Sequence, residues 1–154
     1  TVTASTSSVT GLGHLQGETL DVLSDGVVES DKTVSTSTIA FTTAATSSYE
    51  VGLSYASTIK TMPFEGKLPS GPTRTFKKRI LAISVDLYQT QAVTIDGEAV
   101  TFDADDNGLI APYTGFKRKG SLLGYNKDAT ITITQSEPLD MTILSLDYKV
   151  STGQ

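Results

Sequence analysis

Apolar and polar residues alternate with a period of two along most of the chain. In residues 81–88, every second side chain is a large aliphatic one, and the side chains between them are small, acidic or tyrosyl. A period of two is typical of a β-strand with one buried face. The same pattern recurs in residues 20–23, 38–42, 49–55, 93–102, 130–134 and 139–150. No segment combines helical spacing with helix caps, so the pattern predicts strands throughout.

Turn residues separate the alternating segments. Asp25-Gly26 follows the first of them, and Asp96-Gly97 lies between Ile95 and Val100. An Asp-Gly pair favours the tight turn of a β-hairpin, because both of its residues adopt positive φ at low cost. We therefore expect a turn at Ser24-Asp25-Gly26 and a hairpin at Asp96-Gly97.

The strand pattern predicts an all-β fold with a single domain of about eight to ten strands, built as a sandwich or a partly open barrel. Residues 11–150 form this domain. The Ser/Thr-rich residues 1–10 are expected to be a linker or an edge segment, and residues 151–154 a short C-terminal tail. Residues 65–75 contain Pro and Gly and predict a long exposed loop. In the last segment, alternation places Thr142, Leu144, Leu146, Tyr148 and Val150 on one face.

Charge and composition exclude several classes of protein. The formal net charge of −5 argues against nucleic-acid binding and against docking on anionic lipid. The chain has no cysteine and no apolar run long enough for membrane insertion, and its first residues do not resemble a signal peptide. Two basic clusters stand out, and they indicate either a docking patch or charged edges that keep strands soluble. The clusters are Arg74, Lys77, Lys78 and Arg79, and Lys117, Arg118 and Lys119.

Residues for catalysis are scarce. His14 is the only histidine, and the chain has neither a cysteine nor a Gly-x-Ser-x-Gly motif. We interpret His14 as a structural residue that forms a hydrogen bond within a turn. A pair of catalytic carboxylates among the 17 acidic residues is invisible in sequence. The sequence therefore predicts a protein that is not an enzyme, with no catalytic residues and no cofactor.

One acidic segment is a weak candidate for calcium. Asp103, Asp105 and Asn107 occupy positions 1, 3 and 5 of a calcium loop, and Gly108 occupies position 6. The match ends there, because Thr114 stands at position 12, where a bidentate Glu is required. The alternative interpretation is an acidic turn between strands.

Three aromatic residues are candidates for contact with a glycan. Tyr113, Phe116 and Tyr125 lie in a glycine-rich stretch, and exposed aromatic rings are common platforms for sugars. The alternative is that these rings close the end of the hydrophobic core.

Several short motifs follow one another along the chain. Residues 11–18 and 22–26 have the sequences GLGHLQGE and VLSDG. They resemble "GLxHLEG…VxVLADG", the opening of a β-domain of bacteriophage tail proteins, and later motifs resemble the same domain in the same order. Gln16 stands where the pattern has Glu, Thr36 or Ser37 where it has Gly, and Ser54 where it has Pro. Four further segments match its strands: residues 34–41 resemble "VxxGxITL", 51–55 "VGLPY", 60–64 "KTLPL" and 78–80 "KRI". Residues 114–115 and 138–144 together resemble its closing "TG…PLPLTIL".

The resemblance implies a virion protein located in the tail. The pattern is that of the C-terminal β-domain of nozzle, hub or baseplate proteins, and its opening segment is similar to the FCCH β-barrel segment of ubiquitin-activating enzymes. Such relatives imply a structural role in virion assembly, with other tail proteins and copies of the same chain as partners, in six copies for a nozzle or three for a hub. The alternative is a module at the tail tip that binds a host receptor or surface glycan through residues 65–75 and 103–119.

Overall fold

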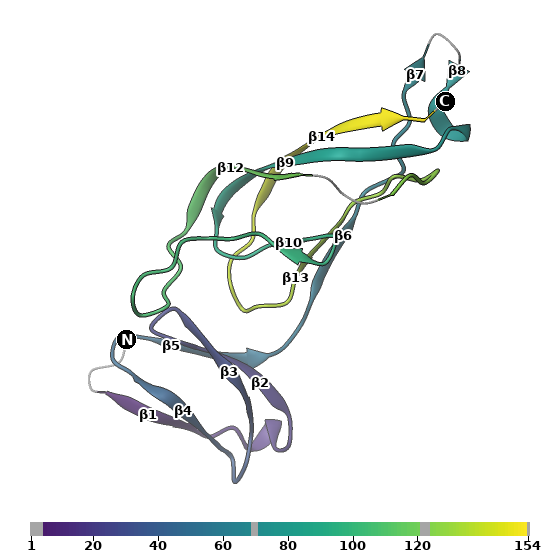
Figure 1. Ribbon diagram of the computed structural model, residues 1–154. Coiled ribbons are helices and arrows are strands. Elements are labelled where there is room, and N and C mark those ends of the chain that lie inside the picture. The colour runs from purple at the N-terminus through teal and green to yellow at the C-terminus, as the bar shows by residue number, and fades with distance from the viewer. Residues whose placement is uncertain (1–4, 69–70, 121–123, 154) are drawn as a thin grey trace. The chain divides into compact units, whose positions relative to one another are not determined.

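The computed structural model describes residues 5–153 except 69–70 and 121–123 (Figure 1). Strands dominate these residues, and the two helices are single 3-10 turns. The all-β class predicted from the alternation is therefore confirmed. The contacts within the chain divide it into two units, which we describe separately. Unit 1 contains residues 1–56, 103–111 and 136–139, and unit 2 contains the remainder. Neither helix in the described ranges has the length and apolar character needed to cross a bilayer.

Unit 1 is built from two open sheets around one core. Its elements are β1 (Thr6–Thr10), η1 (Gly13–Leu15), β2 (Thr19–Ser24), β3 (Val27–Thr33), β4 (Thr38–Ala45) and β5 (Tyr49–Leu53). One sheet has the order β3-β2-β5, and the other pairs β1 with β4. The buried side chains come mainly from β2 and β4: Leu20, Val22, Val34, Ile39, Phe41 and Ala45. The alternation of β2 and β4 thus supplies the apolar face that each sheet buries.

Unit 2 also has two larger sheets that share a core. Its elements are β6 (Ser57–Lys60), β7 (Lys67–Leu68), β8 (Gly71–Pro72), η2 (Thr73–Thr75), β9 (Lys78–Thr90), β10 (Thr94–Ile95), β11 (Glu98–Ala99), β12 (Tyr113–Gly120), β13 (Thr132–Gln135) and β14 (Ile143–Thr152). The sheets have the orders β11-β10-β13-β6 and β12-β9-β14, and β7 pairs with β8. The core residues are Ile80, Ile83, Val85, Leu87, Val93, Ile95, Ala129, Ile131 and Ile133.

The expected hairpin at Asp96-Gly97 is present, and the expected turn at Asp25-Gly26 also joins two paired strands. Asp25 and Gly26 have φ of 52° and 82° and connect β2 to β3, and Asp96 and Gly97 have φ of 47° and 80° and connect β10 to β11. Positive φ at both central positions is typical of the type I′ turn, which matches the twist of antiparallel strands.

The two ends of the chain and the predicted loop differ from the sequence expectation. Thr6–Thr10 form strand β1, which pairs with β4, while residues 1–4 lie outside the described part. Ser151 and Thr152 belong to β14 and do not form a separate tail. Within residues 65–75, η2 buries Thr73, whose hydroxyl accepts the Gly66 N–H at 2.8 Å. Strands remote in sequence, β4 and β9, pair with β1 and with the end of β14, whereas the partner of Thr73 is only seven positions away.

Two β-bulges displace the predicted faces. The side chains of Ile83, Val85 and Leu87 are buried as expected. On β9, Leu81 is an extra residue, because Ala82 pairs with Lys149 and Ile80 pairs with the next residue, Val150. On β14 the extra residue is Leu144, which is 60% exposed. The prediction that Leu144 shares a face with Leu146, Tyr148 and Val150 was wrong, because a bulge shifts the alternation by one position.

The turn before β4 contains a strained threonine. Thr36 and Ser37 have φ of 50° and 60°, between Ser35 and Thr38, whose backbones form two hydrogen bonds of 3.1 and 3.0 Å. Positive φ is unfavourable for a β-branched side chain by about 1–2 kcal/mol, whereas Asn tolerates it. We expect Thr36→Asn to raise the free energy of unfolding by about 1 kcal/mol in urea titrations. Thr10→Asn, in extended β1, should give no gain, and an equal gain there would show that strain at Thr36 is not the cause.

Candidate functional site

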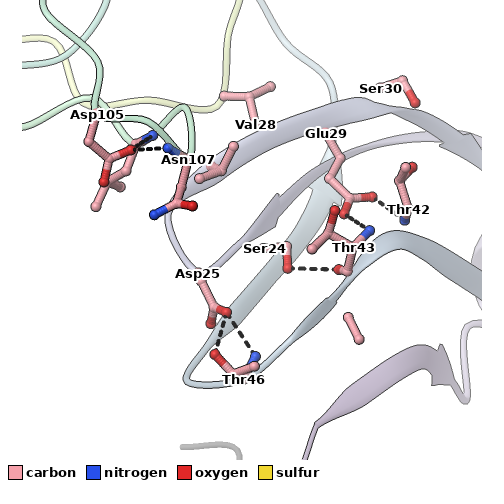
Figure 2. Close-up of a pocket in the computed structure, with 13 residues that line it drawn as sticks. Ser24, Asp25, Val28, Glu29, Ser30, Thr42, Thr43, Thr46, Asp105 and Asn107 are labelled. Carbon is pink, nitrogen blue, oxygen red and sulfur yellow. Dashed lines mark hydrogen bonds between the residues drawn. The ribbon is translucent and has the colours of Figure 1, made fainter.

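A hollow of about 650 Å³ in unit 1 is the best-formed candidate site (Figure 2). It lies between β3 and β4, which are margins of different sheets, and residues 105–109 line another side. Its lining combines carboxylate, amide, hydroxyl and aliphatic side chains. The lining residues are Ser24, Asp25, Val27, Val28, Glu29, Ser30, Thr42, Thr43, Ala44, Thr46, Asp105, Asn107 and Leu109.

Asp25 ties two turns together at the rim of the hollow. Its Oδ1 accepts the N–H groups of Ser47 and Ser48 at 2.7 and 2.9 Å. Its Oδ2 accepts both the N–H and the hydroxyl of Thr46 at 2.8 Å. The Asp25 N–H in turn donates to the Ser48 carbonyl at 2.9 Å. The hydrogen bonds from the Ser48, Thr46 and Ser47 backbone hold the pKa of Asp25 far below its usual range, because they stabilise the ionised form.

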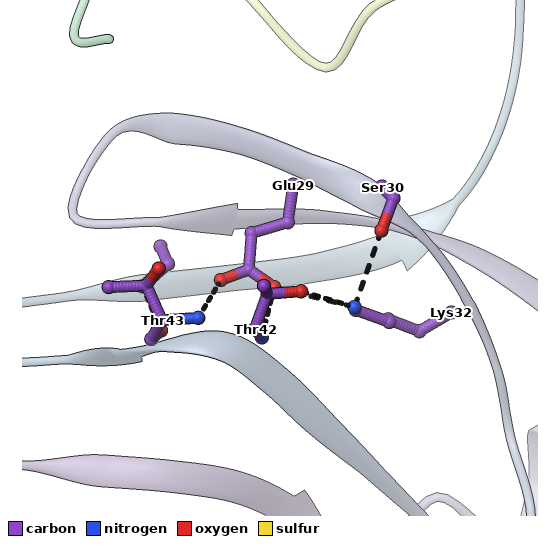
Figure 3. A network of polar contacts seen from close by, with 6 residues as sticks. Glu29, Ser30, Lys32, Thr42 and Thr43 are labelled. Carbon is purple, nitrogen blue, oxygen red and sulfur yellow. Dashed lines mark hydrogen bonds and ion pairs between the residues drawn. The ribbon is translucent and has the colours of Figure 1, made fainter. Parts of the chain in front are cut away.

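Glu29 covers part of the free edge of β4 (Figure 3). Its Oε2 accepts the Thr42 N–H at 2.7 Å and its Oε1 accepts the Thr43 N–H at 2.8 Å. Lys32 Nζ lies 3.7 Å from Oε2 and donates to the Thr42 hydroxyl at 2.7 Å. Burial raises the pKa of Glu29, but the two backbone hydrogen bonds outweigh burial, so the pKa is lower than usual.

Ser24 adds a third side chain to this edge, since its hydroxyl donates to the Thr43 carbonyl at 3.1 Å. Side chains of the β2–β3 hairpin therefore replace a neighbouring strand along β4. A general acid requires a raised pKa, whereas both Asp25 and Glu29 have lowered ones. The hydrogen bonds of Ser24, Asp25 and Glu29 hold the β2–β3 hairpin against β4 and the turn that follows it.

The candidate calcium segment forms a closed turn. Ala104 and Ile110 form a β-bridge, and Asp105 Oδ1 accepts the N–H groups of Asn107 and Leu109 at 2.9 and 2.8 Å. This is the acidic turn that the sequence left as the alternative to calcium. In the described part of the chain, no group of three or more His, Cys, Asp or Glu side chains is placed to hold a metal ion. Asp103 is exposed and lies just before this bridge.

The three candidate glycan residues do not form one platform. Asn126, next to Tyr125, forms a β-bridge with Lys78 at the start of β9, whereas Phe116 pairs with Asp86 near the other end of β9. At ~3.3 Å per residue, Lys78 and Asp86 are about 26 Å apart along the strand. Phe116 and Tyr125 are 61% and 50% exposed. Tyr113 is partly buried, donates its hydroxyl to the Phe116 carbonyl at 3.0 Å, and is covered by Lys117 Nζ at 4.5 Å from the ring centroid.

The basic clusters are broken up by local contacts. Lys78 is only 1% exposed, and its Nζ donates to the Thr73 carbonyl at 2.9 Å. Arg74 pairs with Glu65 at 3.2 Å, and Lys119 pairs with Glu98 at 2.6 Å. The first cluster is therefore not a continuous surface patch, since one of its members points into unit 2.

His14 lies in η1 and is exposed, but Gln16 forms the side-chain bonds of this turn. The Gln16 amide donates to the Val34 carbonyl at 3.3 Å and accepts the Ser37 N–H at 2.8 Å. Within the described ranges the His14 side chain has no hydrogen bond, so the expectation that it braces the turn was wrong. An amide both donates and accepts, which the Glu of the resembling pattern cannot do when ionised.

The roles of Asp25 and Glu29 were missed at the level of sequence. Asp25 was identified only as a turn residue, and its partners are 21 to 23 positions away. No local motif signals such contacts. Comparisons with known proteins gave no family profile that matches the chain and no similar curated protein.

Proposed function

We propose that this chain is a structural component of a bacteriophage tail, in a nozzle, hub or baseplate, and that it mediates virion assembly. Its partners are other tail proteins and further copies of itself. The observation that supports this proposal best is that residues of the resembling motifs tie neighbouring segments of the fold together.

Motif residues from three parts of the chain act in this way. Gln16 joins η1 to the segment before β4. Thr61 exchanges backbone and hydroxyl hydrogen bonds with Ile131, at 2.9 Å each. Lys78, at the start of β9, holds the carbonyl of Thr73. Side chains used to brace a scaffold are what a structural module requires, and the braced carboxylates Asp25 and Glu29 support a role other than catalysis.

Immunoelectron microscopy tests the assignment. Antibodies raised against the purified chain should label one end of the tail on phage particles of the source, and leave capsids and host cells unlabelled. Antibodies that bind the purified chain but label no part of the particle would contradict the proposal. Peptide mass spectrometry of purified particles provides an independent control, because it detects the chain even where an epitope is covered.

The hollow in unit 1 supports a second candidate function, binding of a host-surface glycan. Its hydroxyl groups and the side chain of Asn107 suit a polyhydroxylated ligand. Binding on a glycan array that is lost in Asn107→Ala and kept in Phe116→Ala would favour the hollow. Loss in Phe116→Ala alone would favour the exposed ring on β12.

A further inference from the structure

The sheet β12-β9-β14 ends in two strands with a free edge. β9 lies between the other two strands, and β14 runs along the margin of the sheet (Figure 1). With ten residues, β14 is the longest edge strand in the described part of the chain. A free edge exposes unpaired N–H and C=O groups, which either must be protected or will pair with another chain.

Two other edges in the described part of the chain are protected. The β4 edge is covered by Glu29, as described above. On β12, the consecutive residues Lys117, Arg118 and Lys119 occupy the middle of the strand. Two antiparallel copies of β12 centred on Arg118 would place Lys117 opposite Lys119, and like charges directly opposite each other are destabilising. Repulsion between these side chains therefore disfavours pairing of β12 with β12 of a second copy.

β14 has the opposite charge pattern. From Ser145 to Thr152 the strand itself has no extra residue, because the nearby bulge at Leu81 is on β9. Asp147 and Lys149 lie two residues apart and are both exposed, so they share the outer face. Neither forms an ion pair within the described residues. Leu146 and Tyr148 are half-buried and lie on the inner face, against the core.

We propose that β14 pairs antiparallel with β14 of a second copy of this chain, centred on Tyr148. Asp147 then lies opposite Lys149 of the other copy, and the two-fold symmetry repeats this pair. Leu146 lies opposite Val150 on the inner face, also twice. The two three-stranded sheets join into one continuous sheet with a closed, isologous interface.

The charges of the side chains and the sheet face to which they point determine the register centred on Tyr148. Residues directly opposite each other in an antiparallel pair point to the same face, so the centre must coincide with a residue. Centring on Asp147 places two aspartates opposite each other, and centring on Lys149 places two lysines together. Only the register centred on Tyr148 opposes Asp147 and Lys149 twice.

This inference goes beyond the proposed function, because it assigns only a contact between two copies, and the three or six copies that the resemblance implies would need further contacts. The pairing itself depends only on β14, and would hold if the chain came from another kind of assembly. Failure of antibody labelling would overturn the tail assignment and leave the strand pairing intact. Failure of the experiment below would overturn the pairing and leave the tail assignment intact.

Charge reversal at the two positions gives a specific test. Asp147→Lys opposes cations at both symmetric positions, and Lys149→Asp opposes anions. We expect each variant alone to raise the dimer dissociation constant by about 10- to 100-fold, since two favourable cross-strand pairs become repulsive. An equimolar mixture of the two variants should form a heterodimer in native mass spectrometry, because each position then faces the opposite charge. The double variant D147K/K149D should restore the homodimer.

Urea titrations serve as the folding control, because both side chains are exposed and each variant should keep the midpoint of the wild-type monomer. The proposal is overturned if the wild-type chain stays monomeric, if either variant dimerises as well as the wild type, or if the mixture forms no heterodimer. A trimer that forms without any dimer would also overturn it, because an isologous strand pair joins copies two at a time.

Discussion

Replacement of Ile83 by Ala should lower the free energy of unfolding by about 3–4 kcal/mol, because it leaves a cavity in the core of unit 2. Ile83 is 0% exposed and lies on β9, the central strand of its sheet. Its register partners are Lys119 on β12 and Tyr148 on β14. Few other atoms can move into the space that the side chain leaves, since strands flank it on both sides. Urea titration followed by circular dichroism measures the loss.

Ile59→Ala is the matched control for this prediction. Ile59 has the same side chain and also lies in a strand, β6, but it is 48% exposed. Its truncation should cost less than about 1 kcal/mol, because less apolar area leaves water there on folding. Equal losses at Ile59 and Ile83 would contradict the assignment of β9 to the centre of the core.

Asp25→Asn should destabilise unit 1 at neutral pH and remove much of its sensitivity to acid. The folded state holds the pKa of Asp25 below its ordinary value of 3.8, so the stabilisation is present above that value and is lost as pH falls through the folded pKa. Glu29 adds to the same trend, since its pKa lies below its ordinary value of 4.5. The wild-type chain should therefore lose stability steadily below about pH 4.5.

Hydrogen exchange and urea titration at a series of pH values measure this effect. Exchange at the N–H groups of Thr46, Ser47 and Ser48 should accelerate in the variant, because Asp25 accepts hydrogen bonds from all three. Asp31→Asn is the control, an exposed carboxylate on β3 without a hydrogen bond in the described structure. If Asp31→Asn reduced the pH dependence of stability as much as Asp25→Asn does, the loss of one negative charge would explain the effect. The hydrogen bonds that Asp25 accepts would then not be its cause.

The fold was predictable wherever local chemistry decides the conformation. The Asp25-Gly26 and Asp96-Gly97 turns follow from the ease with which these residues adopt positive φ. The alternation of Val85 and Leu87 follows from burial of one face of a strand. Bulges were not predictable, because a single extra residue such as Leu144 does not change composition or local propensity. The period-two alternation then predicts the wrong sheet face for residues next to the bulge.

The candidate site was less predictable, because its contacts join residues far apart in sequence. Glu29 reaches the N–H groups of Thr42 and Thr43 across 13 and 14 positions. Sequence proximity was also misleading for Phe116 and Tyr125, which adjoin different ends of β9. Lys78 illustrates the same limit, since its neighbours in the basic cluster gave no signal that its side chain is buried.

The most direct test of the account is the mass of the wild-type chain by sedimentation equilibrium over a wide concentration series. Self-pairing through β14 predicts a reversible transition from the 16.3 kDa monomer to a species of twice that mass. A single 16.3 kDa species throughout the series would contradict the account, because the free edge of β14 would then have no affinity for its own copy.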